Sequence, residues 1–178
     1  TVRYRVVPKD GESFEIESPA SLPEASDISR IEEPVIHATI HLPNEFIGQV
    51  LGLCEGRRGI KQGIEYAGTN RAMLRYELPL SEVVLDFYDK LKSVSRGYAS
   101  LDYEIIDFRV ADMIKLDILI NGDPVDALSC IVHREKAPYM GRAVALKLKR
   151  AIPRQLFEVI IQAAIGQKIV ARERNSAM

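Results

Sequence analysis

The residues of this chain that could do chemistry are its three histidines, its two cysteines and a run of cations near the C-terminus. His37 and His41 lie four residues apart on an expected strand, about 13 Å from one another, which is too far to bind one metal ion. Cys54 and Cys130 match no metal or redox spacing, and their aliphatic neighbours favour buried thiols in a reducing, cytoplasmic compartment over a disulfide. His133 has no serine or cysteine nucleophile with a supporting acid nearby. We therefore expect no metal site and no nucleophile–base pair.

Carboxylates and phosphate-binding loops give no catalytic signal either. Asp102 and Glu104 share one face of an expected strand, and we interpret them as a solvated edge rather than a catalytic pair. No Gly-x-x-x-x-Gly-Lys-Ser/Thr loop occurs, so the sequence holds no P-loop nucleotide site. We expect this chain by itself to have no catalytic residue, no cofactor site and no enzyme activity.

The cations between His133 and Arg154 are the strongest chemical signal. This stretch contains a single acid, Glu135, and seven basic residues: Arg134, Lys136, Arg142, Lys147, Lys149, Arg150 and Arg154. A basic helix face of this kind binds phosphates and speeds encounter with a polyanion. Two alternatives stay open: an ordinary solvated helix face, or an amphipathic helix lying on an anionic membrane.

Composition sets the wider limits. The chain has 178 residues, enough for one domain or two small ones, and its 47% hydrophobic and 28% charged content excludes wholesale disorder. Lys+Arg 24 against Asp+Glu 25 excludes a polycation, although the first 34 residues carry eight acids and only four bases. No apolar run approaches the ~20 residues that span a bilayer.

The first segment, residues 1–34, is expected to be a terminal hairpin of a preceding, truncated domain followed by a linker. Two alternating runs flank Asp10-Gly11, which is typical of a hairpin. Residues 18–34 are rich in proline, serine and acids, which favours an extended linker. A hairpin that packs on the next domain is the alternative.

Residues 35–112 contain an internal duplication. In each half a strand ends in Leu-Pro and a helix ends at Arg-Gly, so Pro43 and Pro79 suit helix starts and Gly59 and Gly97 suit C′ positions. Two such halves predict an α+β, ferredoxin-like split βαβ sandwich, with two helices on one face of a four-stranded antiparallel sheet. The strand from Val35 lacks the aromatics of RNA-recognition domains, so that binding mode is not predicted.

Residues 113–178 are expected to form a second small α+β domain that is truncated. Its last residues, 172–178, are expected to pack against nothing obvious and to be cut mid-element. Asn121-Gly122 predicts a hairpin, and Pro138 opens a helix that runs to Ile152. Two strands around Gly166 follow. The helix places five residues on one apolar arc and four cations opposite: Met140, Val144, Leu148, Ala151 and Ile152 against Arg142, Lys147, Lys149 and Arg150.

Several long motifs carry a family resemblance. The stretches EGRRG from Glu55, LPLSE from Leu78 and RGYASLDYE from Arg96 resemble the fifth domain of translational GTPases of the elongation factor G class. KLDILINGDPVDALS from Lys115 and PRQLFEVIIQAAIGQKIVARE from Pro153 narrow the resemblance to the LepA family.

This resemblance implies a ribosome-dependent GTPase whose GTP and Mg²⁺ are bound by a domain upstream of this sequence. It implies a C-terminal domain that contacts transfer RNA, and a role in back-translocation or translation fidelity, with partial peripheral association to the cytoplasmic membrane. It adds Arg57, Arg58, Lys61 and Arg96 to the cation run as candidates for RNA contact. Cations at helix ends also complement the helix dipole, which is the other explanation for Arg57, Arg58 and Arg96. The equivalent fragment of another translational GTPase, such as BipA, and a ferredoxin-like small-molecule sensor remain alternatives.

Overall fold

The computed structural model describes residues 2–178. The chain folds into two compact units. One contains the chain up to Arg5 together with Glu32–Val110, and we call it the ferredoxin-like unit. The other contains Val6–Ile31 together with Ala111–Met178, and we call it the α4 unit. The domain boundaries expected after residues 34 and 112 stay predictions.

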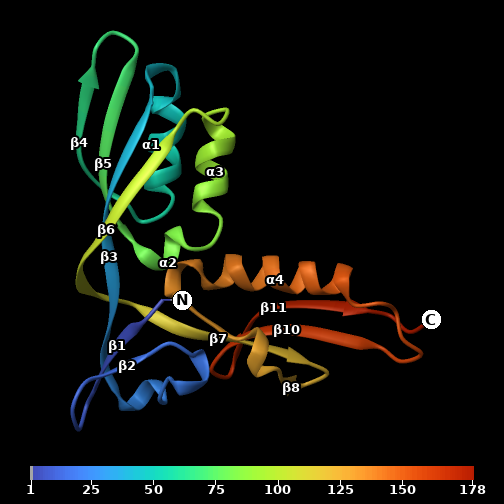
Figure 1. Cartoon of the computed structure of the whole chain (residues 1–178). Coiled ribbons are helices and arrows are strands. Elements are labelled where there is room, and N and C mark those ends of the chain that lie inside the picture. The colour runs from blue at the N-terminus through green and yellow to red at the C-terminus, as the bar shows by residue number, and fades with distance from the viewer. Residues whose placement is uncertain (1) are drawn as a thin grey trace. The chain divides into compact units, whose positions relative to one another are not determined.

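The ferredoxin-like unit has the predicted split βαβ topology. Its sheet has the order β4-β5-β3, with β6 on the other side of β3 (Figure 1). The elements are β3 (Ile28–Pro43), α1 (Ile47–Glu55), β4 (Ile60–Ala67), β5 (Arg71–Pro79), α2 (Leu80–Val83), α3 (Phe87–Val94) and β6 (Ser100–Ala111). The two βαβ halves therefore interleave their strands, and the longer helices α1 and α3 lie on one face of the sheet (Figure 1).

The period-2 pattern of β3 decides which face is covered. Ile36, Ile40 and Leu42 are completely buried and pack with residues of β5, α1 and α3 in one apolar core. His37 and His41 point to the other face and are partly exposed, as predicted for a strand with one buried side. The two histidines are thus excluded from the core.

The second helix of the duplication is broken, which the sequence did not predict. α2 ends at Val83 and α3 begins at Phe87. At this break Arg57 donates to the carbonyl oxygen of Glu82, the acceptor that in a continuous helix bonds to the amide of Asp86. A long-range contact thus accompanies the break in the helix.

The turns after α1 and α3 correct the expected role of their glycines. Arg58 and Arg96 take the first left-handed position, with φ of 56° and 53°, and Gly97 follows Arg96 with a positive φ of 84°. Gly59 does not have positive φ; instead a Cβ there would lie 2.6 Å from the carbonyl oxygen of Cys54. Gly59 is therefore required by close packing rather than by its backbone dihedral angle.

The N-terminal segment contains the predicted hairpin and a shorter linker than expected. β1 (Tyr4–Pro8) and β2 (Phe14–Ile16) are neighbours in a sheet. The expected linker 18–34 is wrong from Ile28 on, because β3 already begins there. Ile31, Glu33 and Pro34 are buried, so this acidic stretch is packed as part of the strand.

The C-terminal part of the α4 unit, Ala111–Met178, consists of one α-helix over a five-stranded sheet of order β11-β10-β7-β8, with β9 pairing β7. Its elements are β7 (Met113–Ile120), β8 (Asp123–Pro124), β9 (Cys130–His133), α4 (Ala137–Ala151), β10 (Val159–Ile165) and β11 (Lys168–Asn175). The Asn121-Gly122 hairpin is confirmed, with both residues at positive φ. Figure 1 shows α4 running along β10 and β11.

The buried side of α4 is lined by small residues. Ala137, Gly141 and Ala145 are its buried positions, while most of the predicted apolar arc is partly buried against the core. A Cβ on Gly141 would lie 3.0 Å from the Cβ of Ala163, so the helix approaches β10 closely. Ala151, predicted for this arc, is exposed.

The end of the chain is more ordered than expected. β11 continues to Asn175, whose buried side-chain amide donates to the carbonyl oxygens of Lys149 (3.1 Å) and Ile152 (3.3 Å). Since the last carbonyls of a helix lack helical donors, Asn175 caps α4. The expectation that residues after 171 pack against nothing is therefore wrong.

Candidate nucleic-acid interface

The solvent face of α4 presents cations that have no carboxylate partner. At 100° per residue, Arg150 lies opposite the buried Gly141, and Arg142 and Lys147 lie about 100° and about 120° from Gly141 on the two sides of the helix. All three cations are exposed, and within residues 2–178 none of them forms an ion pair. We call Arg142, Lys147 and Arg150 the α4 cation triad.

The fourth predicted cation of this helix is engaged. Lys149 Nζ lies 3.4 Å from Glu173 Oε1, and the carboxylate comes from β11. Lys149 and Arg150 also lie in the last turn of α4, where cations complement the helix dipole. The helix dipole therefore accounts for part of the charge at this end, but not for Arg142 in the first half of the helix.

The cations on either side of α4 hold local structure. Arg134 Nε donates to Asp112 Oδ2 at 2.9 Å, and Arg154 donates to the carbonyl oxygens of Ser176 and Ala177 at 3.2 and 2.6 Å. Lys136 ends the 3₁₀ turn Arg134–Lys136 that leads into the helix and is half-buried.

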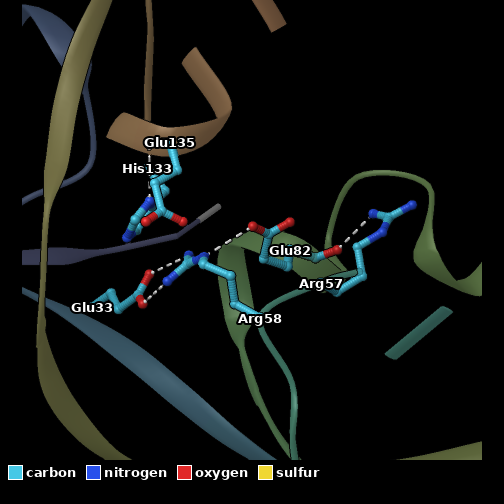
Figure 2. A network of polar contacts seen from close by, with 6 residues as sticks. All are labelled: Glu33, Arg57, Arg58, Glu82, His133 and Glu135. Atoms are coloured by element: carbon cyan, nitrogen blue, oxygen red, sulfur yellow. Dashed lines mark hydrogen bonds and ion pairs between the residues drawn. The ribbon is translucent and has the colours of Figure 1, made fainter. Parts of the chain in front are cut away.

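Arg58 is the centre of a polar network in the ferredoxin-like unit. Figure 2 shows its guanidinium between the carboxylates of Glu33 and Glu82. Nη1 and Nη2 donate to Glu33 at 2.7 and 3.1 Å, and Nε donates to Glu82 at 3.1 Å. Burial opposes the charged form, but the hydrogen bonds and charges of the two carboxylates outweigh it and raise the pKa of Arg58. This bidentate geometry ties the turn to β3 and α2.

Arg57 is engaged on the neighbouring element. Its Nη1 donates to the Glu82 carbonyl at 3.0 Å and its Nη2 pairs with Asp86 Oδ1 at 2.7 Å (Figure 2 shows the first contact). The hydrogen bond from Arg57 holds the pKa of Asp86 below its usual value. Both arginines of the EGRRG motif thus bind acids of their own unit, and RNA contact through them stays a prediction.

The sequence could not signal these partners. Glu33, Glu82 and Asp86 lie between 24 and 29 positions from the arginines they contact. No local spacing rule connects residues so far apart. Only the fold brings them together.

Lys61 and Arg96, the other predicted cations of this unit, are exposed. In the part of the chain that the structure describes, neither forms an ion pair. Lys61 stands on the edge strand β4, opposite Tyr76 of β5. They are separate single cations rather than a patch.

His133 has a structural role. Its Nδ1 accepts a hydrogen bond from the Glu135 amide at 3.2 Å and thereby caps the 3₁₀ turn that follows (Figure 2).

No group of three or more His, Cys, Asp or Glu side chains suited to a metal occurs among residues 2–178. Over the same residues no helix is long and apolar enough to cross a membrane.

The two cysteines are unreactive thiols. Neither is in a disulfide. Burial, with a smaller contribution from the charge of Glu55, raises the pKa of Cys54 to about 12. Burial also raises the pKa of Cys130. Since the thiolate is the nucleophile, neither cysteine is a candidate for covalent chemistry near neutral pH.

Comparison with known proteins finds family matches in both units. Residues 30–119 match the family described as elongation factor G C-terminus, which is just over half of the chain. The chain belongs to this family. Residues 120–178, which include α4 and its cation triad, match the family described as GTP-binding protein LepA C-terminus. The elongation factor G C-terminus family thus covers the βαβ duplication, and the LepA match covers the candidate interface.

Curated relatives of this family match the whole chain. Proteins named elongation factor 4 are 59% identical over 178 residues in Oleidesulfovibrio alaskensis, 55% in Lawsonia intracellularis and 56% in Nitratidesulfovibrio vulgaris. The chain spans about 30% of the length of these relatives. A crystal structure of a protein from Thermus thermophilus aligns with this chain at 27% identity and a TM-score of 0.43. The alignment covers 46% of this chain and 12% of the Thermus protein.

Proposed function

We propose that this chain is the ribosome- and tRNA-contacting C-terminal part of a LepA-type, ribosome-dependent GTPase. The observation that carries this proposal is the α4 cation triad, because Arg142, Lys147 and Arg150 are exposed and free of intramolecular ion pairs within residues 2–178. Three such cations on a helix fixed to its sheet are available for phosphates at no loss of internal contacts. The names of the relatives support translation as the setting.

The triad makes contacts of a particular kind. Arginine and lysine at helical spacing neutralise backbone phosphates, which orient a protein on RNA without selecting a sequence. Close packing of Gly141 against Ala163 holds α4 against β10, so the triad is presented on a fixed element. We therefore expect sequence-independent, salt-sensitive binding at this face.

GTP with Mg²⁺ is the cofactor that a LepA-type function implies, and the residues of this chain do not fit it. The sequence contains no glycine-rich P-loop, and residues 2–178 hold no metal-ligating cluster. GTP binding and hydrolysis therefore belong, in this proposal, to a part of the whole protein outside this sequence.

The physiological part of the proposal is a fidelity role in translation, by back-translocation of tRNAs on stalled or mis-translocated ribosomes. In this proposal the protein works in the cytoplasm and is partly associated with the surface of the cytoplasmic membrane. The exposed basic face of α4 supports the proposed membrane association, since cations near a membrane surface are attracted to anionic lipids.

Co-sedimentation of the 178-residue chain with bacterial ribosomes across a salt series tests this proposal. We expect salt-sensitive binding that the variant Arg142→Glu, Lys147→Glu, Arg150→Glu loses. A matched control reverses three exposed cations elsewhere, Lys9, Arg71 and Lys168, and should retain binding. Equal loss in both variants, or retention in both, would contradict the assignment of the interface to α4.

A further inference from the structure

One exposed aromatic side chain on α4 is unexplained by packing. Tyr139 lies in the first turn of the helix and is 70% exposed, whereas its neighbour Met140 packs against the core. Within residues 2–178 Tyr139 takes part in no hydrogen bond, ring stacking or cation–ring contact. A large aromatic ring that lies mostly in water adds little apolar burial to this unit.

Tyr139 lies in line with the cations. Residues Tyr139, Arg142, Leu146 and Arg150 follow one another at i, i+3, i+7 and i+11, so they form one stripe along the solvent face. Leu146, the other apolar member, is 40% exposed. From Tyr139 to Arg150 the helix rises about 16 Å, which is long enough to follow several nucleotides of a single strand.

A ring beside cations suits one class of ligand. Proteins that hold single-stranded RNA combine positive charges along the backbone with aromatic rings on which unpaired bases stack. A duplex offers phosphates to the same cations, but its bases are already stacked on each other and give the ring no partner. One ring and one leucine are too small an apolar surface to insert into a membrane, because a helix that inserts uses a broad apolar face.

We propose that Tyr139 stacks on an unpaired base while Arg142, Lys147 and Arg150 contact the adjoining phosphates, so that this face binds single-stranded RNA in preference to duplex RNA. The inference rests on the proposed function, since it names the kind of RNA that the α4 cation triad holds.

Binding of the 178-residue chain to a fluorescently labelled, unstructured RNA of about 12 nucleotides, and to a duplex of the same length, tests this inference. Tyr139→Ala should weaken single-strand binding about 5- to 150-fold, the range that one stacked base supplies, and leave duplex binding within about twofold. Tyr139→Phe should retain single-strand binding, because the stacking needs the ring and not the hydroxyl group. Tyr66→Ala removes a 65% exposed tyrosine of the other unit and should change nothing.

The outcomes separate this inference from the function on which it rests. If Tyr139→Ala binds the single strand as well as the parent chain, or weakens single strand and duplex equally, the stacking role is wrong. The variant Arg142→Gln, Lys147→Gln, Arg150→Gln should weaken binding to both RNAs, and if it weakens neither, the phosphate-binding role of α4 is wrong as well. Binding to vesicles of phosphatidylserine that depends on Tyr139, without an effect on RNA, would assign the tyrosine to a membrane and overturn the inference.

Discussion

Arg58 combines a left-handed backbone with a guanidinium that joins two buried carboxylates, those of Glu33 and Glu82. Since removing one partner of a buried ion pair leaves an uncompensated charge, we predict that Arg58→Met lowers the free energy of unfolding by about 3–5 kcal/mol. Urea unfolding followed by circular dichroism measures this change.

Arg96 provides the control, because it has almost the same φ but is exposed at the end of α3. Arg96→Met should change the free energy of unfolding by less than about 0.5 kcal/mol, as expected for a surface site. Equal effects of the two substitutions would show that backbone strain, and not the Glu33–Arg58–Glu82 network, dominates at these turns.

The pair Arg57–Asp86 predicts a pH dependence. Arg57 lowers the pKa of Asp86 in the folded chain, so the stabilisation from this pair is present above the ordinary aspartate pKa and is lost as the pH falls through the lowered value. Arg57→Met should therefore raise the pKa of Asp86 towards its ordinary value. Titration of the Asp86 carboxyl by NMR in both chains measures the shift, and an unchanged pKa would contradict the role of Arg57.

Gly59 gives a prediction on packing. A Cβ there would lie 2.6 Å from the carbonyl oxygen of Cys54 and 2.9 Å from Cδ2 of Leu78, so Gly59→Ala should destabilise the chain by about 1–3 kcal/mol. Gly52→Ala, in α1 where nothing lies within 4 Å, should instead stabilise by up to about 1 kcal/mol. Thermal melting of both variants measures the contrast, and destabilisation by both would contradict this account.

At the scale of elements, the capping of α4 by Asn175 connects the end of β11 to the helix that carries the cation triad. Asn175→Ala removes two hydrogen bonds to helix carbonyls and should destabilise the chain by about 1–3 kcal/mol. Ser176→Ala changes the next, exposed side chain and should be neutral. Chemical denaturation of the two variants tests this, and a neutral Asn175→Ala would show that α4 needs no cap from β11.

Periodic patterns predicted most of these elements, and long-range contacts explain where they failed. The alternation in β3 and the Asn121-Gly122 turn are local signals, and both are confirmed. At the break between α2 and α3, the carbonyl oxygen of Glu82 accepts a hydrogen bond from Arg57, which lies 25 positions away. Such a contact leaves no trace in the local period of the sequence.

The buried side of α4 shows a second limit of pattern analysis. A search for large apolar residues identifies Met140 and Leu148, but the positions nearest the sheet are Ala137, Gly141 and Ala145. Small residues let a helix approach its sheet closely, and a hydrophobicity pattern assigns them little weight.

At the scale of the whole molecule, a net charge of −1 conceals a separation of acidic and basic regions. The sequence located the cations of residues 134–154 but could not tell which of them are available. Arg134, Lys149 and Arg154 bind groups of their own unit, and these partners come from residues between 22 and 24 positions away. The fold thereby reduces the predicted run on α4 to a triad.

The salt dependence of RNA binding tests the central claim most directly, because each phosphate contact adds to the slope of log K against log [salt]. For the 178-residue chain and single-stranded RNA, replacing the three cations of the triad by glutamine should reduce this slope by about 2, at about 0.7 per contact. The control with Lys9, Arg71 and Lys168 changed to glutamine should keep the slope of the parent chain. An unchanged slope in the triad variant would contradict the assignment of the interface to α4.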